Sequence, residues 1–92
     1  MKSIRIRTLT ADDAQAWVAQ RHALWPEIPI NQLESEVAAI AGDEKQAAFG
    51  AFDGDALVGF AELSLHPHAI GCGPGPVAYL EAWRVDDKYR RT

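Results

Sequence analysis

The sequence predicts an α+β fold, in which one strand is followed by two helices and then by three antiparallel strands. Apolar and basic residues alternate over residues 4–8, a period of two that is typical of a strand. Two capping patterns then precede segments whose apolar residues recur at helical spacing. Further on, Asp53-Gly54-Asp55 separates two apolar segments, which is a strong hairpin signal because glycine readily takes a positive φ.

The first strand and the first helix are predicted from short local patterns. Ile4 and Ile6 alternate with two arginines, which indicates a half-buried strand with a solvated basic outer face. Thr10, followed by two aspartates, offers a hydroxyl that can cap a helix. This helix must end by Pro26, because proline lacks a backbone donor and restrains the residue before it.

The rest of the chain divides into one helix and three strands. Asn31 and Glu34 have the spacing of a capping box, so we expect the second helix to open there and to stop at Gly42. Segments 47–52 and 56–65 flank the predicted hairpin, so they are antiparallel neighbours. A loop rich in His, Gly and Pro runs to Pro76, and residues 77–85 form the fourth strand.

Length and composition limit the class of protein. A chain of 92 residues makes at most one domain, and 48% hydrophobic with 24% charged residues is typical of a globular protein. No apolar segment could span a membrane or serve as a signal peptide, so we expect a cytoplasmic protein. The net charge of -4 argues against nucleic acid as a partner and suits a cationic small molecule. Cys72 is the only cysteine and is interpreted as a small loop residue, not a nucleophile.

Four short motifs lie in order along the chain. They are Leu24-Trp25-Pro26, Gly59-Phe60-Ala61-Glu62-Leu63-Ser64-Leu65, Pro76-Val77-Ala78-Tyr79-Leu80-Glu81, and Val85 through Arg91. Their order and spacing resemble those of the aminoglycoside 6'-N-acetyltransferases of the GNAT superfamily, over nearly the whole chain. The chain departs from the family pattern at Ala82, where glycine is usual, and at Asp87, where proline is usual.

The resemblance implies transfer of an acetyl group from acetyl-CoA to a primary amine, and it implicates Glu81 in catalysis. At neutral pH the amine is protonated and cannot attack a thioester, so the enzyme must hold the ammonium and remove a proton. Glu81, on the fourth strand, would attract the cation and accept its proton directly or through water. The alternative is a solvated glutamate on a strand face.

The co-substrate acetyl-CoA is implied to bind along the end of this strand. Backbone groups of Trp83, Arg84 and Val85 would bind the thioester carbonyl and the pantetheine arm, because the strand splays from its neighbour in the superfamily. Arg90-Arg91-Thr92 corresponds to the first three positions of the loop that holds the pyrophosphate, Gln/Arg-x-x-Gly-x-Gly/Ala. Without the family context, the two arginines are a solvated charge pair.

The resemblance also assigns residues to the acceptor amine. Trp25 corresponds to a tryptophan that lines the acceptor cleft, where an aromatic face can lie against a sugar ring or a cation. The alternative is a core tryptophan. His68 stands near the position of a family tyrosine and is a second candidate for substrate binding. His66 and His68 lack an assignable third ligand, so no metal is expected.

Two hypotheses of different classes follow. In the first, residues 1–92 are the N-terminal portion of a single GNAT domain, ending before the pyrophosphate loop and inactive alone. In the second, the chain is a non-catalytic binding or interaction module that keeps half of the acetyltransferase fold. Coding sequence for Gly-x-Gly/Ala directly after Thr92 would favour the first.

The half-fold also leads to a prediction about association. We expect at least a homodimer, formed by edge pairing or strand exchange near residues 77–85, because the apolar residues there would lack the cover of later elements. Sedimentation equilibrium measures this directly. A stable monomer of 10.1 kDa across micromolar concentrations would contradict the prediction.

Overall fold

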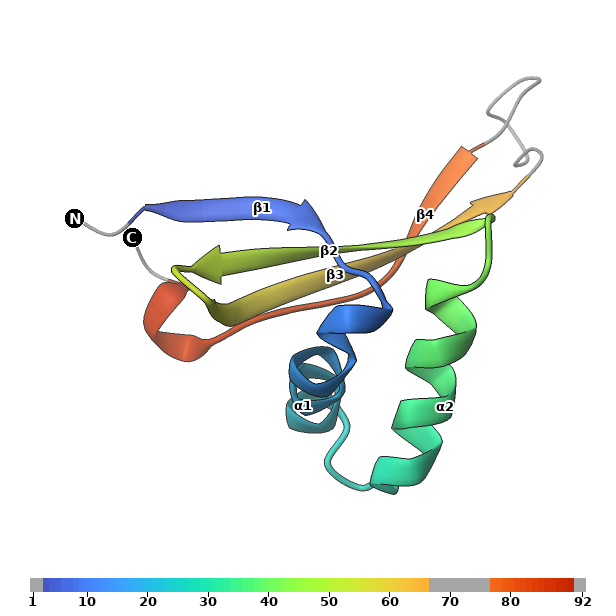
Figure 1. Ribbon diagram of the computed structural model, residues 1–92, viewed down its shortest axis with the longest axis horizontal. Helices are drawn as coiled ribbons and strands as arrows, with labels where there is room; N and C mark the ends of the chain where they lie inside the picture. Colours follow the sequence, from blue (N-terminus) through green and yellow to red (C-terminus); the bar gives the residue numbers. More distant parts are fainter. Residues whose placement is uncertain (1–2, 67–76, 91–92) are drawn as a thin grey trace.

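The computed structural model describes residues 3–66 and 77–90, and it has the predicted α+β architecture (Figure 1). The four strands form one antiparallel sheet in the order β1-β2-β3-β4. The predicted order of strand, two helices and three strands is therefore confirmed. The elements are β1 (Ile4–Thr8), a 3-10 turn (Ala11–Asp13), α1 (Ala14–Leu24), α2 (Ile30–Ala41), β2 (Gln46–Asp53), β3 (Ala56–His66), β4 (Val77–Val85) and a second 3-10 turn (Asp87–Tyr89).

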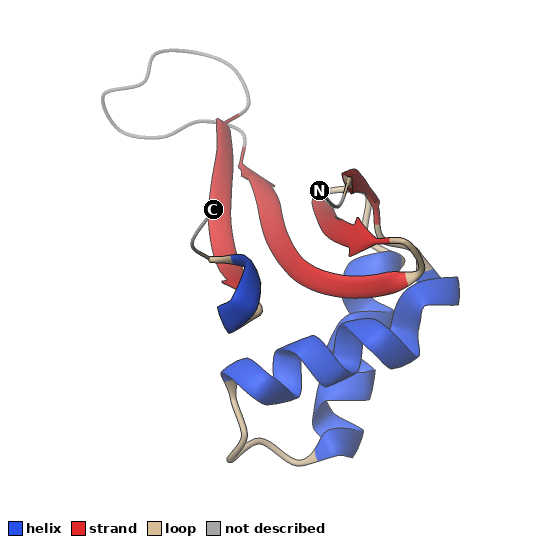
Figure 2. Ribbon diagram, turned by 90° about the vertical axis from the view of Figure 1, so that its left-hand side faces the viewer, coloured by secondary structure: helices blue, strands red, loops and turns tan. Residues whose placement is uncertain are grey.

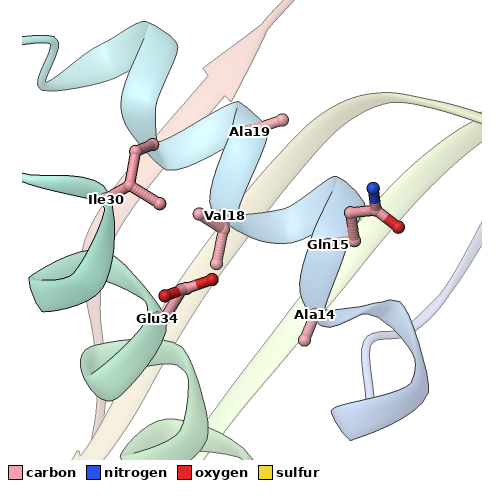
Figure 3. A pocket seen from close by; sticks show the side chains of 6 residues that line it. All are labelled: Ala14, Gln15, Val18, Ala19, Ile30 and Glu34. Carbon is pink, nitrogen blue, oxygen red and sulfur yellow. The ribbon is translucent and has the colours of Figure 1, made fainter.

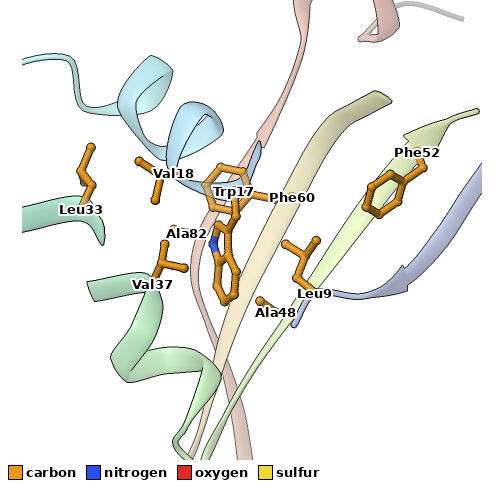
Figure 4. Close-up of a cluster of buried hydrophobic side chains, with 9 residues drawn as sticks. All are labelled: Leu9, Trp17, Val18, Leu33, Val37, Ala48, Phe52, Phe60 and Ala82. Carbon is orange, nitrogen blue, oxygen red and sulfur yellow. The ribbon is translucent and has the colours of Figure 1, made fainter. Parts of the chain in front are cut away.

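Both helices cover the same face of the sheet (Figures 1 and 2). The core lies between them and the strands, with Trp17 of α1 completely buried at its centre (Figure 4). Burying an aromatic side chain of this size contributes roughly 2–3 kcal/mol. The buried residues of this core cluster are Leu9, Trp17, Val18, Leu33, Val37, Ala48, Phe52, Phe60 and Ala82.

The orientation of β1 differs from the prediction. Ile6 is 67% exposed, whereas Arg7 turns to the side of the sheet that the helices cover. The register explains this, because Arg7 lies opposite Gly50 and Arg5 lies opposite Phe52, whose side chain is buried under the helices. The interpretation of Ile4 and Ile6 as the half-buried face, with solvated arginines outside, was therefore wrong.

The first capping pattern is confirmed in a modified form. Thr10 accepts a hydrogen bond from the backbone N–H of Asp12, and the Asp13 carboxylate accepts one from the backbone N–H of Thr10 at 2.9 Å. The capping box opens a 3-10 turn, and α1 follows from Ala14 and ends at Leu24, before Pro26. Backbone N–H groups that are hydrogen-bonded at this position stabilise the start of the helix.

The second capping box was predicted wrongly. The helix begins at Ile30, with Pro29 as its N-cap, and no side chain caps it. Pro29 is extended, with φ −59° and ψ 144°, and its carbonyl accepts from the backbone N–H groups of Gln32 and Leu33. Asn31 therefore lies inside the first turn. The predicted stop at Gly42 is confirmed.

The hairpin and the fourth strand are confirmed. Gly54 has φ 61°, the left-handed conformation that favours glycine at such a turn, and it joins β2 to β3. The strand β4 occupies the predicted residues 77–85 and pairs with β3.

The sheet face away from the helices carries exposed apolar side chains. Ile6, Leu80 and Trp83 are 67%, 57% and 58% exposed, and Phe49 is 39% exposed. No helix of the described residues covers this face (Figure 2).

The ion pair between Arg7 and Asp13 leads to a prediction about pH. The Arg7 guanidinium, at 2.8 Å, and the Thr10 amide together lower the pKa of Asp13 to about 2. A lowered folded-state pKa stabilises the protein above the ordinary value near 3.8, and the effect is lost as pH falls through about 2. Because Arg7 is 45% exposed and screened by solvent, we expect about 1 kcal/mol.

Urea unfolding between pH 5 and pH 2 measures this contribution. Asp13→Asn should lower stability at pH 5 and flatten its fall toward pH 2. Asp12→Asn is the control, because it removes a neighbouring carboxylate that makes no ion pair with the described residues. Parallel pH profiles for the wild type and Asp13→Asn would contradict the prediction.

Candidate active site

A buried polar cluster lies between α1 and β3. The Glu62 carboxylate accepts from the indole Nε1–H of Trp17 at 2.9 Å and from Arg21 Nε at 2.8 Å and Nη2 at 3.2 Å. Arg21 also donates through Nη1 to Glu36 on α2. Glu62 and Arg21 are only 4% and 7% exposed. Each of these buried charges has an oppositely charged partner, which offsets the cost of removing it from water.

The sequence analysis did not single out Glu62 or Arg21 as site residues. A signal was present in β3, where Phe60 and Glu62 are two residues apart and so share the buried face. A second signal was the spacing of Trp17 and Arg21, four residues apart and thus on one face of α1.

Glu36 on α2 is half-buried, and its carboxylate binds Arg21. The Gln32 amide and the Arg21 guanidinium both hydrogen-bond its carboxylate and hold the pKa of Glu36 below its usual range. Glu36 therefore carries its negative charge at neutral pH, next to Arg21.

Trp25 is the C-cap of α1 and is half-buried against the core. Its backbone N–H donates to the Arg21 carbonyl at 2.8 Å, and the Arg21 guanidinium lies over its ring, 4.9 Å from the centroid. Both its backbone and its indole are thus tied to Arg21. Part of the side chain remains accessible.

Glu81 occupies a β-bulge in β4. Glu62 pairs with Ala82 and Leu63 pairs with Leu80, so Glu81 is the extra residue with no partner opposite. It is exposed and makes no hydrogen bond or ion pair with the residues that the structure describes. A bulge of this kind redirects a side chain and interrupts the regular ladder.

The cluster connects Trp25 with the bulge. Arg21 contacts the Trp25 ring and binds Glu62, and Glu62 lies opposite Ala82, the residue after Glu81. Trp25, through Arg21, and Glu81, through its neighbour Ala82, are therefore both connected to Glu62 on β3.

The predicted cofactor strand is an edge strand of the described sheet. β4 pairs only with β3, so alternate backbone groups along Trp83, Arg84 and Val85 face away from the sheet. The Arg84 side chain is occupied, because its Nη1 donates to Gln20 Oε1 at 2.9 Å and to Asp86.

The end of the described chain is also held in place. Arg90 donates to the Val85 carbonyl at 2.8 Å, and Tyr89 donates to Asp53 in the β2–β3 hairpin. Arg91, Thr92 and His68, which were also predicted to belong to the site, lie outside the described residues.

His66 belongs to a small polar group at the end of β3. Its ring packs edge-on against Tyr79 with centroids 4.5 Å apart, and its Nε2 lies 3.0 Å from the Ser64 hydroxyl. Over residues 3–66 and 77–90, no cluster of three metal-ligating side chains occurs. Likewise, no helix in this part of the chain is long and apolar enough to cross a bilayer.

A groove of about 540 Å³ lies between α1 and α2 (Figure 3). Ile30 and Glu34 of α2 line it opposite Val18 of α1. It contains none of the predicted site residues, and Glu34 is its only charged side chain.

Comparison with known proteins identifies the family. Residues 8–92 match the acetyltransferase (GNAT) family. The chain belongs to this family. Among curated relatives, it is 38% identical over 91 residues to the aminoglycoside N(6')-acetyltransferase type 1 of Klebsiella aerogenes, covering 94% of this chain and 59% of that enzyme. It is also 38% identical over 88 residues to the enzyme of the same name from Stenotrophomonas maltophilia, covering 92% and 56%.

The fold comparison agrees. The structure of the aminoglycoside N-acetyltransferase AAC(6')-Iy in complex with CoA superposes with a TM-score of 0.88 at 27% identity, over 99% of this chain and 60% of that one. A second structure of AAC(6')-Iy, with a CoA-S-monomethyl-acetylneamine bisubstrate analogue, gives a TM-score of 0.86 at 28% identity, over 97% and 61%. The chain spans about 60% of the length of these relatives.

The buried cluster leads to a prediction about stability. Glu62→Gln should lower the free energy of unfolding by about 3 kcal/mol, because it leaves a buried guanidinium without its main counter-ion. Glu36→Gln should cost less than about 1 kcal/mol, because this carboxylate is 37% exposed. Urea denaturation of the two variants measures the difference. Equal losses would show that Glu62 is not the principal partner of Arg21.

Proposed function

We propose that this chain carries the acceptor side of an N-acetyltransferase, which moves the acetyl group of acetyl-CoA to a primary amine, specifically the 6'-amine of an aminoglycoside. The proposal draws support from the family and from the names of its relatives. The observation that carries it is Glu81, an exposed carboxylate at a bulge of the edge strand β4.

Glu81 would hold the amine and take its proton. The acceptor arrives as an ammonium ion, which the carboxylate attracts, and loss of a proton to Glu81 or to a bridging water frees the nitrogen lone pair. An exposed carboxylate is reachable by a polar substrate. The bulge leaves Glu81 outside the regular pairing of β4 with β3.

Outward-facing amides of β4 would assist the transfer. When the amine nitrogen attacks the thioester carbonyl carbon, negative charge develops on the carbonyl oxygen, and N–H groups near Trp83 to Val85 would stabilise it. The C–S bond then breaks and CoA leaves as a thiol after gaining a proton. Acetyl-CoA is the co-substrate, and Arg90, Arg91 and Thr92 would begin its pyrophosphate site.

The exposed apolar face of the sheet supports the second candidate function, a binding or interaction module. The exposed side chains Ile6, Leu80 and Trp83 form a surface that another chain could cover. A homodimer or strand-exchanged oligomer would bury the same surface, and it is compatible with the acetyltransferase function.

The role of Glu81 leads to a direct test. In a protein that also carries the part of the acetyltransferase domain that the relatives have beyond the matched region, Glu81→Gln should lower kcat by about 100-fold or more, because the amide cannot accept the proton. KM for acetyl-CoA should change little. Release of the CoA thiol with a saturating aminoglycoside measures the rate, and mass spectrometry identifies the acetylated amine.

Glu44→Gln is the matched control, since it removes the charge of an exposed glutamate remote from β4 in the sequence. It should leave turnover unchanged. Unchanged turnover in Glu81→Gln would reduce Glu81 to a surface residue. A wild-type protein that carries the whole acetyltransferase domain and acetylates no aminoglycoside would overturn the proposed function.

A further inference from the structure

Arg21 is a buried charged residue with two carboxylate partners, yet the chemistry proposed above does not use it. Its Nε and Nη2 bind the two oxygens of Glu62, and its Nη1 binds Glu36. These bonds lie in the plane of the guanidinium. They fix its orientation and leave its flat face free for a stacking partner.

That partner is Trp25. The guanidinium carbon lies 4.9 Å from the centroid of the indole, close enough for a cation–π contact. The backbone of Trp25 is fixed as well, through its N–H bond to the Arg21 carbonyl at the end of α1. Arg21 therefore restrains both the position and the tilt of the ring.

The charge behind the ring is negative overall. Arg21 contributes one positive charge, and Glu36 and Glu62 contribute two negative charges. A lone guanidinium behind Trp25 would repel a second cation at the ring. With both carboxylates present, the sum of one positive and two negative charges attracts one.

We propose that Arg21 is a positioning residue for Trp25, and that the triad of Glu36, Arg21 and Glu62 makes the indole a platform for a polycationic acceptor. This inference rests on the proposed function, because Trp25 would hold the same amine acceptor that Glu81 deprotonates. Arg21 acts through the indole, with no contact to the reacting amine. Glu36 tunes the charge, and Glu62 holds the guanidinium in place.

Arg21→Lys is the first test, because lysine keeps the charge near Glu62 and loses the planar fork. The indole N–H signals of the protein, observed by ¹H–¹⁵N NMR and assigned with Trp25→Phe, report the ring directly. We expect the Trp25 signal to move in Arg21→Lys. In the protein that carries the whole acetyltransferase domain, KM for neamine should rise about 10-fold, with kcat and KM for acetyl-CoA changed less than about 2-fold.

Glu36→Gln is the second test, because it removes one negative charge and keeps the fork on Glu62. We expect the Trp25 signal to stay in place, KM for neamine to rise about 3-fold, and the salt dependence of that KM to weaken. This variant also tests the proposal if Arg21→Lys fails to fold.

Arg7→Lys is the matched control. Arg7 also pairs with a carboxylate through two nitrogens and lies over an aromatic ring, Phe52, at 4.1 Å. Its substitution should lower the melting temperature and leave KM for neamine unchanged. An equal rise of that KM in Arg7→Lys and Arg21→Lys would show a general effect on stability and would overturn the inference.

Other outcomes are equally decisive. An unmoved Trp25 signal in Arg21→Lys would overturn the positioning role. A fall in kcat together with a rise in both KM values would overturn it too. A wild-type protein whose Trp25 signal shifts with neamine but which transfers no acetyl group would overturn the proposed function and support this inference. No shift of the Trp25 signal at millimolar neamine would overturn the platform.

Discussion

The described structure depends on the buried ion pair between Arg21 and Glu62. It joins α1 to the centre of the sheet, and Trp17 donates to the same carboxylate from the middle of the core. Taking two charges out of water is costly, so such a pair stabilises the fold only if its hydrogen bonds are complete. Here every buried polar side-chain atom of the described residues has a partner. The pair therefore favours one arrangement of α1 on β3. The positions of Trp25 at the end of α1 and of the β4 bulge beside β3 depend on this arrangement.

Two features of the candidate site follow from that arrangement. Trp25 lies at the end of α1 and stacks on Arg21, while Glu81 bulges from β4 beside Ala82, the partner of Glu62. Trp25 thus depends on a charged residue that never reaches the surface. The bulge gives Glu81 a different setting from its neighbours, since it belongs to neither the paired ladder nor the buried face. A polar centre with exposed groups at its margin is consistent with the acceptor site proposed above, because rigid elements hold its side chains in position.

The two faces of the sheet have different roles. The helices cover the face that carries Glu62 and Phe60, and the opposite face leaves Ile6, Leu80 and Trp83 open. The outer edge of β4 is open too, which leaves amides there for a ligand or for another strand. The same strand therefore serves both proposals, acetyl transfer at its edge and bulge, and association through its apolar face.

The sequence by itself determined the order of elements, the C-terminal ends of α1 and α2, the hairpin at Gly54 and the extent of β4. These features depend on local patterns such as proline, glycine and alternation. It also determined the family, through motifs carried in order along the chain. Only the tertiary structure decided which face of β1 turns toward the helices, since Arg7 on that face pairs with Asp13 on a different element. The start of α2 at Ile30 was likewise decided by Pro29, whose extended backbone made the capping box at Asn31 unnecessary. The bulge at Glu81 and the pairing of Arg21 with Glu62 required the register between strands and the docking of α1, because these contacts join residues that lie far apart in the sequence.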